Sequence, residues 1–498
     1  MQPPSTLSTR RQIQLPSKRQ LECTHTHDKE KKEMYCMMTM TRFSHNQKMT
    51  DLNEPEAKLE ALLDIINSSA RQAIAEYKNT GHGVPSADAA TFHPLDSATD
   101  TIALKKAIRL LEGAYHQLST ILAPPQHTLM NFVFNYNWAC IDVALRARIA
   151  DVLDKHPEGL NVDRLAEAVN LDKSKTARVL RALSLMGCFK EVAPDVFANT
   201  RLSLILKSTN NTGCLAGLHS QDVPKYAGVL YESMTDEEFA HSHEPDKAPW
   251  VLALRKEGMK GNNHWELFKN NDEKREAFQR AMLGLNEMVG ASAVLHHYPW
   301  DNISSVVDIG SGIGTFSTPL AKMFPHLKIT NQDLPQVLLQ AQNVWKKTAP
   351  EALLDGRVEF VPFNFLEDVP VAGKDVYYLR NIIHNWPDRD ATTILRNIRK
   401  VMGLNSRVLI HDCVFFHTLQ EPDIGTDGLS TAPEPMLPNF GAGAHRSYQM
   451  DMTMWLIHNT KERTLGELKI LGASVGLVLT QVYDLVETMV VEFRIAQS

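Results

Sequence analysis

Apolar residues in the last two hundred positions come in short runs separated by polar and glycine-containing turns. Five runs alternate with helical patterns, and two more close the chain without a long helix between them. The alternation predicts parallel strands joined by helices, and the closing pair predicts a hairpin that brings in an antiparallel strand. We therefore expect an α/β fold over 291–498, with strands at 303–309, 327–332, 358–363, 375–379, 407–411, 478–483 and 488–493.

Helical spacing dominates the chain before this sheet. It predicts helices over about 59–74 and 102–118, the second ending at Pro124-Pro125. These two helices, a preface at 49–125, have apolar faces that must pack on something else, and a partner chain is one option. Residues 126–290 then carry a helix over about 143–153, a short helix after Gly159 that holds Leu165, Ala168 and Val169, and a third helix over about 179–186. A strand–turn–strand at 189–198 and a further helix at 264–290 follow. The first part of this pattern predicts a winged helix.

The third helix of the winged helix raises the question of DNA binding. Its basic residues are Lys173, Lys175, Arg178 and Arg181. Acidic residues lie nearby in the sequence and no basic arm adjoins, so a solvated helix face is the interpretation we favour.

Charge divides the chain unevenly. Residues 1–48 hold nine basic and four acidic side chains, a net charge of +5. Because the whole chain carries −6, residues 49–498 carry a net charge of −11. An acidic body argues against a general nucleic-acid binder, because phosphate affinity depends on clustered Lys and Arg. The basic segment resembles a mitochondrial transit peptide in part, but Pro3, Pro4 and Pro16 interrupt any amphipathic helix. A disordered tail, or a start upstream of the mature protein, is the preferred interpretation.

Six cysteines among 498 residues include no CxxC pair, so a disulfide framework or a structural zinc site is not expected. The composition fits a reducing compartment, which we take as the cytoplasm. No run approaches the roughly 18 apolar residues of a membrane span, and no membrane partner is expected.

A glycine-rich turn follows the first strand of the sheet. It contains Gly310, Gly312 and Gly314, preceded by Asp308. The spacing is GxGxG, and a carboxylate just before the turn suits a cationic ligand better than a pyrophosphate. Asp333 ends the next strand, where a carboxylate can accept hydrogen bonds from both ribose hydroxyls. Together these features predict a nucleotide-type cofactor.

Five stretches now make a family resemblance specific: 306–314, 330–335, 375–386, 408–412 and 459–464. Residues 130–495 resemble class I S-adenosylmethionine-dependent O-methyltransferases of the caffeate/flavonoid type, and within them fungal enzymes that methylate polyketide phenols. The resemblance implies a Rossmann-like seven-stranded sheet with its last strand antiparallel, an α-rich winged-helix dimerisation domain, and a homodimer.

The resemblance also implies a cofactor site for S-adenosyl-L-methionine. Gly310 and its neighbours would line the methionine part and Asp333 the ribose, with Asn364 and Phe365 at the adenine. Arg380 would border the cofactor and Trp386 would stack near its ring. The family usually has Asp where this chain has Asn364, and His-Asp-Trp where it has His384-Asn385-Trp386. An amide at 364 can still offer a donor and an acceptor to adenine.

The chemistry of methyl transfer predicts a general base. A phenol with a pKa near 10 must lose its proton, and a neutral histidine can take it. His384 follows the fourth strand closely, at the edge where open α/β sheets bind ligands. Asp412 and Glu462 stand at the positions where the family places carboxylates beside this base. His411 lies on its strand, and we expect it to be packed.

Met282 and Met288 lie at helical spacing ahead of the sheet, where they either pack in the core or form an apolar wall for a planar aromatic substrate. No HxxxH, HExxH or carboxylate cluster suggests a metal. The insertion at 417–447 is rich in Gly and Pro and is either a lid or a surface excursion.

We therefore expect an enzyme that methylates a hydroxyl of a small aromatic or polyketide molecule. Two alternatives stay open: a winged-helix regulator that senses a ligand without catalysis, and a methyltransferase that acts on a macromolecule.

Overall fold

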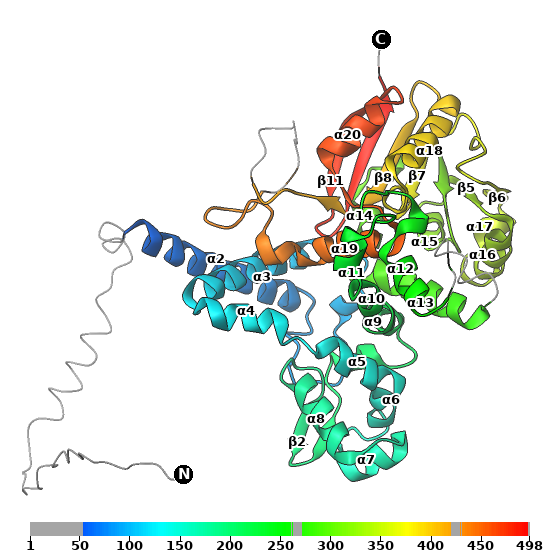
Figure 1. Ribbon diagram of the computed structural model, residues 1–498. Helices are drawn as coiled ribbons and strands as arrows, with labels where there is room; N and C mark the ends of the chain where they lie inside the picture. Colours follow the sequence, from blue (N-terminus) through cyan, green and yellow to red (C-terminus); the bar gives the residue numbers. More distant parts are fainter. Residues whose placement is uncertain (1–52, 260, 262–270, 420–428, 430, 497–498) are drawn as a thin grey trace, which may run out of the picture. The chain divides into compact units, whose positions relative to one another are not determined.

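A computed structural model describes residues 53–259, 261, 271–419, 429 and 431–496 (Figure 1). The basic tail predicted at 1–48 lies outside these residues. Contacts divide the chain into 1–58 and 59–498, and only the start of α2 (Glu54–Asn79) is described in the first unit. The rest of this account concerns the second unit.

The second unit contains a seven-stranded sheet in the order β11-β12-β8-β7-β4-β5-β6. Strand β12 runs antiparallel to both of its neighbours, and the other pairs are parallel. The expected strands, including the closing hairpin, are confirmed. Their bounds are β4 Ser305–Ile309, β5 Lys328–Asp333, β6 Val358–Pro362, β7 Val376–Arg380, β8 Arg407–Asp412, β11 Leu477–Asp484 and β12 Met489–Ile495.

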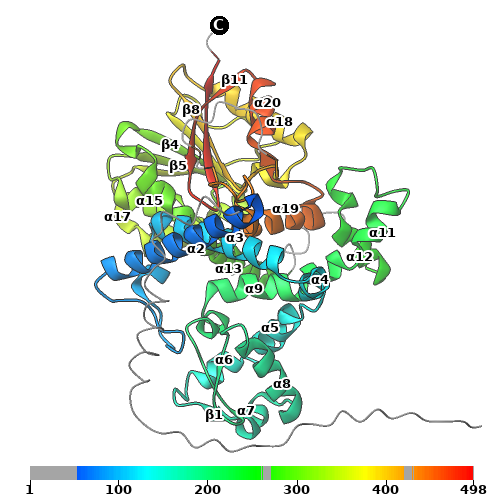
Figure 2. The ribbon, with the colours of Figure 1, turned by 90° about the vertical axis from the view of Figure 1, so that its left-hand side faces the viewer.

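Helices cover both faces of the sheet (Figures 1 and 2), and its central strands β4, β7 and β8 are almost wholly buried. The connecting helices are α15 Ser317–Met323, α16 Pro335–Thr348, α17 Pro350–Leu354, α18 Asp388–Val401, α19 His445–His458 and α20 Leu465–Ala473. Successive residues of β4 enter different cores: Val306 faces one cluster, and Val307 and Ile309 face the other.

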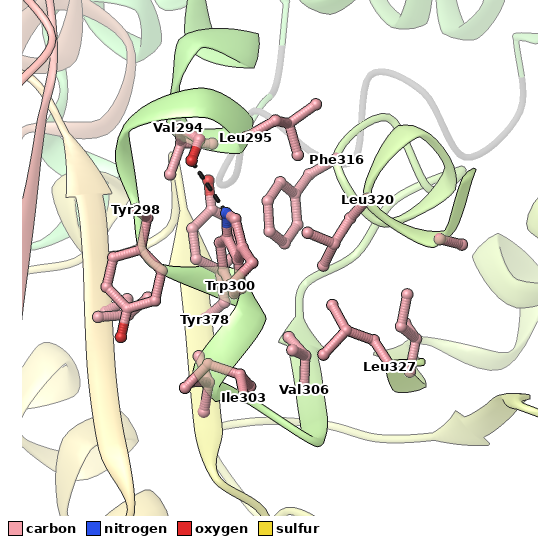
Figure 3. Close-up of a cluster of buried hydrophobic side chains, with 14 of the residues drawn as sticks. Val294, Leu295, Tyr298, Trp300, Ile303, Val306, Phe316, Leu320, Leu327 and Tyr378 are labelled. Atoms are coloured by element: carbon pink, nitrogen blue, oxygen red, sulfur yellow. Dashed lines mark hydrogen bonds between the residues drawn. The ribbon is translucent and has the colours of Figure 1, made fainter. Parts of the chain in front are cut away.

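The first of these clusters is centred on aromatic rings (Figure 3). Trp300 is fully buried and its Nε1 donates to the Val294 carbonyl at 2.9 Å. Phe316 stacks on Tyr378 with ring centroids 3.8 Å apart. Because Phe316 directly precedes α15 and Tyr378 lies on β7, this contact anchors the end of the glycine-rich turn to the sheet.

The winged helix has its predicted helices and hairpin, with one correction. The helix expected over 143–153 is two helices, α5 (Asn137–Arg146) and α6 (Ile149–Leu153), because Arg148 adopts a left-handed φ of 52° between them. The remaining elements are β1 Leu160–Asn161, α7 Val162–Val169, α8 Lys173–Ser184, β2 Lys190–Ala193 and β3 Val196–Ala198.

Helices that link the winged helix to the sheet are α9 Asn211–Gln221, α10 Val223–Ala227, α11 Leu230–Thr235, α12 Pro249–Lys256, α13 Asp272–Val289 and α14 Val294–His297. The helix expected at 264–290 is described only as α13, and its predicted Trp265 and Phe268 lie outside the described residues. Gly284 lets α13 approach α9 closely, since a Cβ there would lie 2.5 Å from the Asn211 carbonyl oxygen.

The preface contains α2 and α3 (Ile102–Leu122), and it is followed by a short helix that the sequence did not indicate, α4 (Pro125–Val133). The apolar faces of α2 and α3 pack on segments of the same chain: Leu62 and Ala114 contact Met436 and Phe440 of the insertion. The described residues 431–447 of the insertion are thus held against α3, neither a free lid nor a plain surface excursion. No described helix has the length and apolarity to cross a membrane.

Candidate active site

The glycine-rich turn after β4 shapes the first half of the site. All three glycines have positive φ, with values of 69° at Gly310, 55° at Gly312 and 89° at Gly314. A Cβ on Gly314 would lie 2.2 Å from Trp345 Nε1, whereas a Cβ on Gly312 would meet nothing within 4 Å. The turn is therefore packed against the protein at Gly314 and open at Gly312.

Two carboxylates flank this turn. Asp333 Oδ2 accepts from the Gly312 N–H at 2.8 Å, and its Oδ1 accepts from the Leu334 N–H at 2.7 Å. Asp308 is buried beneath the turn, and burial raises its pKa to about 6. One oxygen of Asp308 and the hydroxyl of Ser311 are buried without a partner among the described residues. A buried acceptor without a donor favours a ligand that brings one.

The residues predicted to border a cofactor surround the same turn. Phe365 and Trp386 meet edge to face with ring centroids 5.5 Å apart, and Phe365 also lies beside Gly310. Arg380, at the end of β7, donates to Thr315 Oγ1 at 2.5 Å. The Asn364 carboxamide is engaged locally, where its Oδ1 accepts from the Leu366 N–H at 3.2 Å.

His384 lies in the turn after β7 and is buried with Glu462. Its Nδ1 is 2.7 Å from Glu462 Oε1. Because an ionised carboxylate can only accept, this bond places a hydrogen on Nδ1 and leaves Nε2 to take a proton. The His384 carbonyl also accepts from Thr460 Oγ1 at 2.7 Å, and the Glu462 N–H donates to Asp451 at 2.9 Å.

Asp412 ends β8 next to the same turn but has a different role. Its Oδ1 accepts from the Asn381 N–H at 2.8 Å and its Oδ2 from the His384 N–H at 3.3 Å. Asn381 has a left-handed φ of 54°. Of the two predicted carboxylates, Glu462 contacts the imidazole, whereas Asp412 holds the backbone that carries it.

The charges of these groups depend on one another. Burial disfavours a charged imidazole, but Glu462 and Asp412 outweigh it and raise the pKa of His384 to about 9. Burial also raises the pKa of both carboxyls. His384 is thus a stronger base than a free histidine.

Arg463 is a buried charged residue that the sequence analysis missed. Its guanidinium donates to the carbonyls of Ile383 at 2.8 Å and Trp386 at 2.7 Å, and pairs with Asp388 at 2.8 Å. It therefore fixes both sides of the His384 turn. The sequence offered one signal for Arg463 as a site residue, namely that it directly follows Glu462.

Three further predictions concern neighbouring residues. His411 is fully buried between Tyr378 and Thr488, with ring nitrogens 2.6 and 2.8 Å from their hydroxyl oxygens, and burial lowers its pKa. It is packed, as expected. Met282 and Met288 pack on a cluster that includes Cys413, the residue after Asp412. No group of metal-ligating residues occurs in the described part of the chain.

On the winged helix, Arg181 pairs with Glu191 and Asp195 at 2.7 Å, and Lys173 pairs with Asp163 at 3.0 Å. These contacts support the interpretation of a solvated helix face.

Comparisons with known proteins agree with this geometry. A family model described as the O-methyltransferase domain matches residues 247–431, and one described as the O-methyltransferase dimerisation domain matches residues 131–209. The 3-O-methyltransferase 2 of Phanerochaete chrysosporium is 34% identical over 443 residues, covering 88% of this chain and 97% of that protein. The O-methyltransferase gedA of Aspergillus terreus is 28% identical, covering 84% and 93%. A solved structure of the mitomycin 7-O-methyltransferase MmcR shares the fold, with a TM-score of 0.59, 23% identity, and coverage of 75% of this chain and 98% of that one.

Proposed function

Because the chain belongs to the family of S-adenosylmethionine-dependent O-methyltransferases, we propose that it methylates a phenolic hydroxyl of a small aromatic or polyketide secondary metabolite, with His384 as general base. The observation that carries the proposal is the buried 2.7 Å bond between His384 Nδ1 and Glu462 Oε1. This bond orients the ring and stabilises the charge that the ring acquires on taking a proton.

The residues around the glycine-rich turn fit the family's cofactor. Asp308 and Ser311 keep unpartnered polar atoms there, and Gly312 leaves open space. In this proposal Asp308 and the turn hold the cationic methionine part, Asp333 holds the ribose, and Asn364, Phe365, Arg380 and Trp386 border the remainder. When bound, S-adenosylmethionine supplies a methyl group on a sulfonium sulfur, activated for in-line attack by a phenolate oxygen.

The chain's own residues then control the acceptor proton. His384 Nε2 receives the hydroxyl proton, and Glu462 compensates the imidazolium. A conjugate acid with a pKa of about 9 lies close to a phenol near 10, so the transfer costs little free energy. Asp412 and Arg463 keep the His384 turn in place throughout.

A methionine-rich cluster beside the base is the proposed wall for the acceptor ring. Its buried members include Cys413, Met450 and Met454, with Met282 and Met288 packed against them. Cys413 directly follows Asp412, and burial together with the nearby carboxylates of Glu462 and Asp412 raises the pKa of its thiol, which supports a position of the cluster beside these groups. Flexible, polarisable side chains suit a planar aromatic molecule.

The proposal also includes a homodimer. Large apolar side chains on α4 and at the start of α5 stay exposed, among them Phe132, Phe134 and Tyr136 at 58%, 64% and 65%. They lie within the segment matched by the dimerisation model, residues 131–209, and apolar patches of this kind mark interaction sites.

The test is a screen of aromatic polyketides and simple phenols with methyl-labelled S-adenosylmethionine, read by mass spectrometry. We expect a labelled methyl ether from the wild-type protein and none from His384→Ala, while both proteins bind S-adenosylhomocysteine. A product that carries no labelled methyl group, or methyl transfer by His384→Ala at the wild-type rate, would contradict the proposal. Label on DNA, RNA or protein instead would favour a macromolecular acceptor.

A further inference from the structure

One face of α3 carries a row of polar side chains, each of which contacts a different distant segment. The row is Lys105, Arg109 and Glu112, whose spacing of four and three residues keeps them on neighbouring turns, and Gln117 lies further along the helix. Figures 1 and 2 both place α3 beside α19. This helix lies outside the segments that the two family models match.

Lys105 contacts the end of α13. Its Nζ donates to the Met288 carbonyl at 2.8 Å, next to Gly290, whose φ of 68° ends the helix. A cation at the carboxyl end of a helix satisfies an unpaired carbonyl and interacts favourably with the helix dipole. Lys105 therefore fixes the end of the helix that carries Met282 and Met288.

Arg109 contacts the turn between β11 and β12. It is 6% exposed, donates to the Val486 carbonyl at 3.2 Å and pairs with Asp484 at 3.4 Å. Its guanidinium also lies 3.9 Å from the ring centroid of Phe440. The same turn leads to Thr488, whose hydroxyl bonds His411, the neighbour of Asp412.

Glu112 contacts the start of α19. Its carboxylate pairs with Arg446 at 3.0 Å, and Arg446 pairs with Glu487 at 2.7 Å. Arg446 lies one turn before Met450. Further along α3, Gln117 Nε2 donates to the Pro435 carbonyl at 2.8 Å.

Glycines bring α3 unusually close to the insertion. A Cβ on Gly113 would lie 2.2 Å from the Phe440 carbonyl oxygen, and a Cβ on Gly443 would lie 2.0 Å from that of Arg109. Since real side chains never approach backbone so closely, both positions require glycine. The helix and residues 440–443 therefore form one packed unit.

Two of the anchored segments, α13 and α19, supply the methionines of the cluster beside His384, and the third supports the strand that ends at Asp412. We propose that α3 is a positioning element for the acceptor-binding wall, with Lys105, Arg109 and Glu112 as its positioning residues. The inference rests on the proposed function only in placing the acceptor at the methionine-rich cluster. It assigns to the preface a part in substrate selection, separate from cofactor binding and from proton transfer.

The test compares Lys105→Met and Glu112→Gln with Lys106→Met in the full-length protein bound to S-adenosylhomocysteine. Lys106 is the neighbouring lysine of α3 and makes no hydrogen bond or ion pair with described residues, so it is the matched control. Hydrogen exchange of peptides covering 285–291, 445–454 and 484–490 should become at least about three-fold faster in the first two variants and stay unchanged in the third. Unchanged exchange in both would overturn the inference.

A second measurement separates positioning from general stability. We expect the Kd for 2-naphthol, a fluorescent fused-ring phenol, to rise about five- to ten-fold in Lys105→Met and Glu112→Gln, with the Kd for S-adenosylhomocysteine within two-fold of wild type. Lys105→Arg should restore most of the loss. Equal weakening of both ligands would overturn the inference, because it indicates unfolding. Failure of the wild type to bind 2-naphthol would instead count against the proposed aromatic acceptor, while hydrogen exchange would still decide the role of α3.

Discussion

In the proposed mechanism, the bond between His384 and Glu462 sets both the direction in which the base points and the pH at which it works. A pKa of about 9 means that only about 1% of His384 is neutral at pH 7 in the free enzyme. Since the neutral form is the base, we expect kcat/KM for the acceptor to rise with pH up to about 9. A profile that is flat between pH 6 and 9 would contradict His384 as the titrating base.

Glu462→Gln tests the cause of this shift. Removing the carboxylate leaves burial as the main influence, so the pKa of His384 falls and the rising limb of the pH profile moves toward or below pH 7. The amide also orients the ring less well, and we expect the plateau of kcat to fall about 10- to 100-fold. Asp412→Asn is the comparison: Asp412 does not bond the ring, so the limb should move less than in Glu462→Gln.

Asp308 makes a separate prediction about stability and cofactor binding. Burial raises its pKa to about 6, so the folded state favours the neutral acid. The contribution of Asp308 to the stability of the free protein is therefore fully present below the ordinary pKa of 3.8 and is lost as the pH rises through about 6. Asp308→Asn should raise the free energy of unfolding at pH 8 by at most about 3 kcal/mol, seen as a higher Tm, and should change it little at pH 4.

The same substitution should weaken S-adenosylmethionine binding about ten-fold, because a charge-assisted contact is lost. Calorimetric titration with the cofactor checks this. A variant that is both less stable at pH 8 and equally tight for cofactor would contradict the assignment of Asp308.

The sequence predicted that His384, Asp412 and Glu462 lie close together, but it could not predict which carboxylate contacts the imidazole. Asp412 and Glu462 stand in equivalent motif contexts, and only the fold shows that Asn381 turns its N–H to Asp412 while the imidazole turns to Glu462. Arg463 was missed for the same reason. Its three partners lie about 75 to 80 residues away, beyond what local spacing can indicate.

At the scale of the elements, the turn between β4 and α15 has one glycine that is needed for folding, Gly314, and one that is expected to serve cofactor binding, Gly312. Gly314→Ala forces a Cβ against the Trp345 indole at 2.2 Å, in a conformation with φ of 89°. The Cβ of Gly312→Ala would contact nothing within 4 Å, so the substitution costs only the strain of a left-handed backbone, about 1–2 kcal/mol. We expect Gly314→Ala to lower Tm several degrees more than Gly312→Ala, and Gly312→Ala to lose cofactor affinity while it stays folded. Thermal unfolding and cofactor titration on both variants measure the contrast, and the reverse order would contradict it.

Strands of the sheet could be predicted closely because each is a short run rich in β-branched or apolar residues and bounded by turns. The helices were harder. Nothing in the spacing of 143–153 indicates the left-handed Arg148 that splits it. The partner of α3 was also hidden, because the residues it contacts, such as Phe440 and Arg446, lie more than three hundred positions later.

For the whole molecule, the exposed apolar residues around α4 are the surface through which the proposed homodimer would associate. Phe132, Phe134 and Tyr136 are more than half exposed, and Trp138 at the start of α5 is 47% exposed. In a monomer these rings would remain in water, at a cost of about 25 cal/mol for each Å² of apolar surface. A second copy of the chain would remove that cost, and it would do so within the segment matched by the dimerisation model.

Phe134→Glu should therefore shift the protein from dimer to monomer in light scattering coupled to size-exclusion chromatography. A buried, unpaired carboxylate in the interface opposes association, and the Phe134 side chain is exposed enough in one chain that the variant should still fold. Leu404→Glu is the control, since Leu404 is 88% exposed on the catalytic half and should leave the dimer intact. If Phe134→Glu remains dimeric at micromolar concentration, or if the wild type is monomeric there, the interface lies elsewhere and the exposed rings serve a different partner.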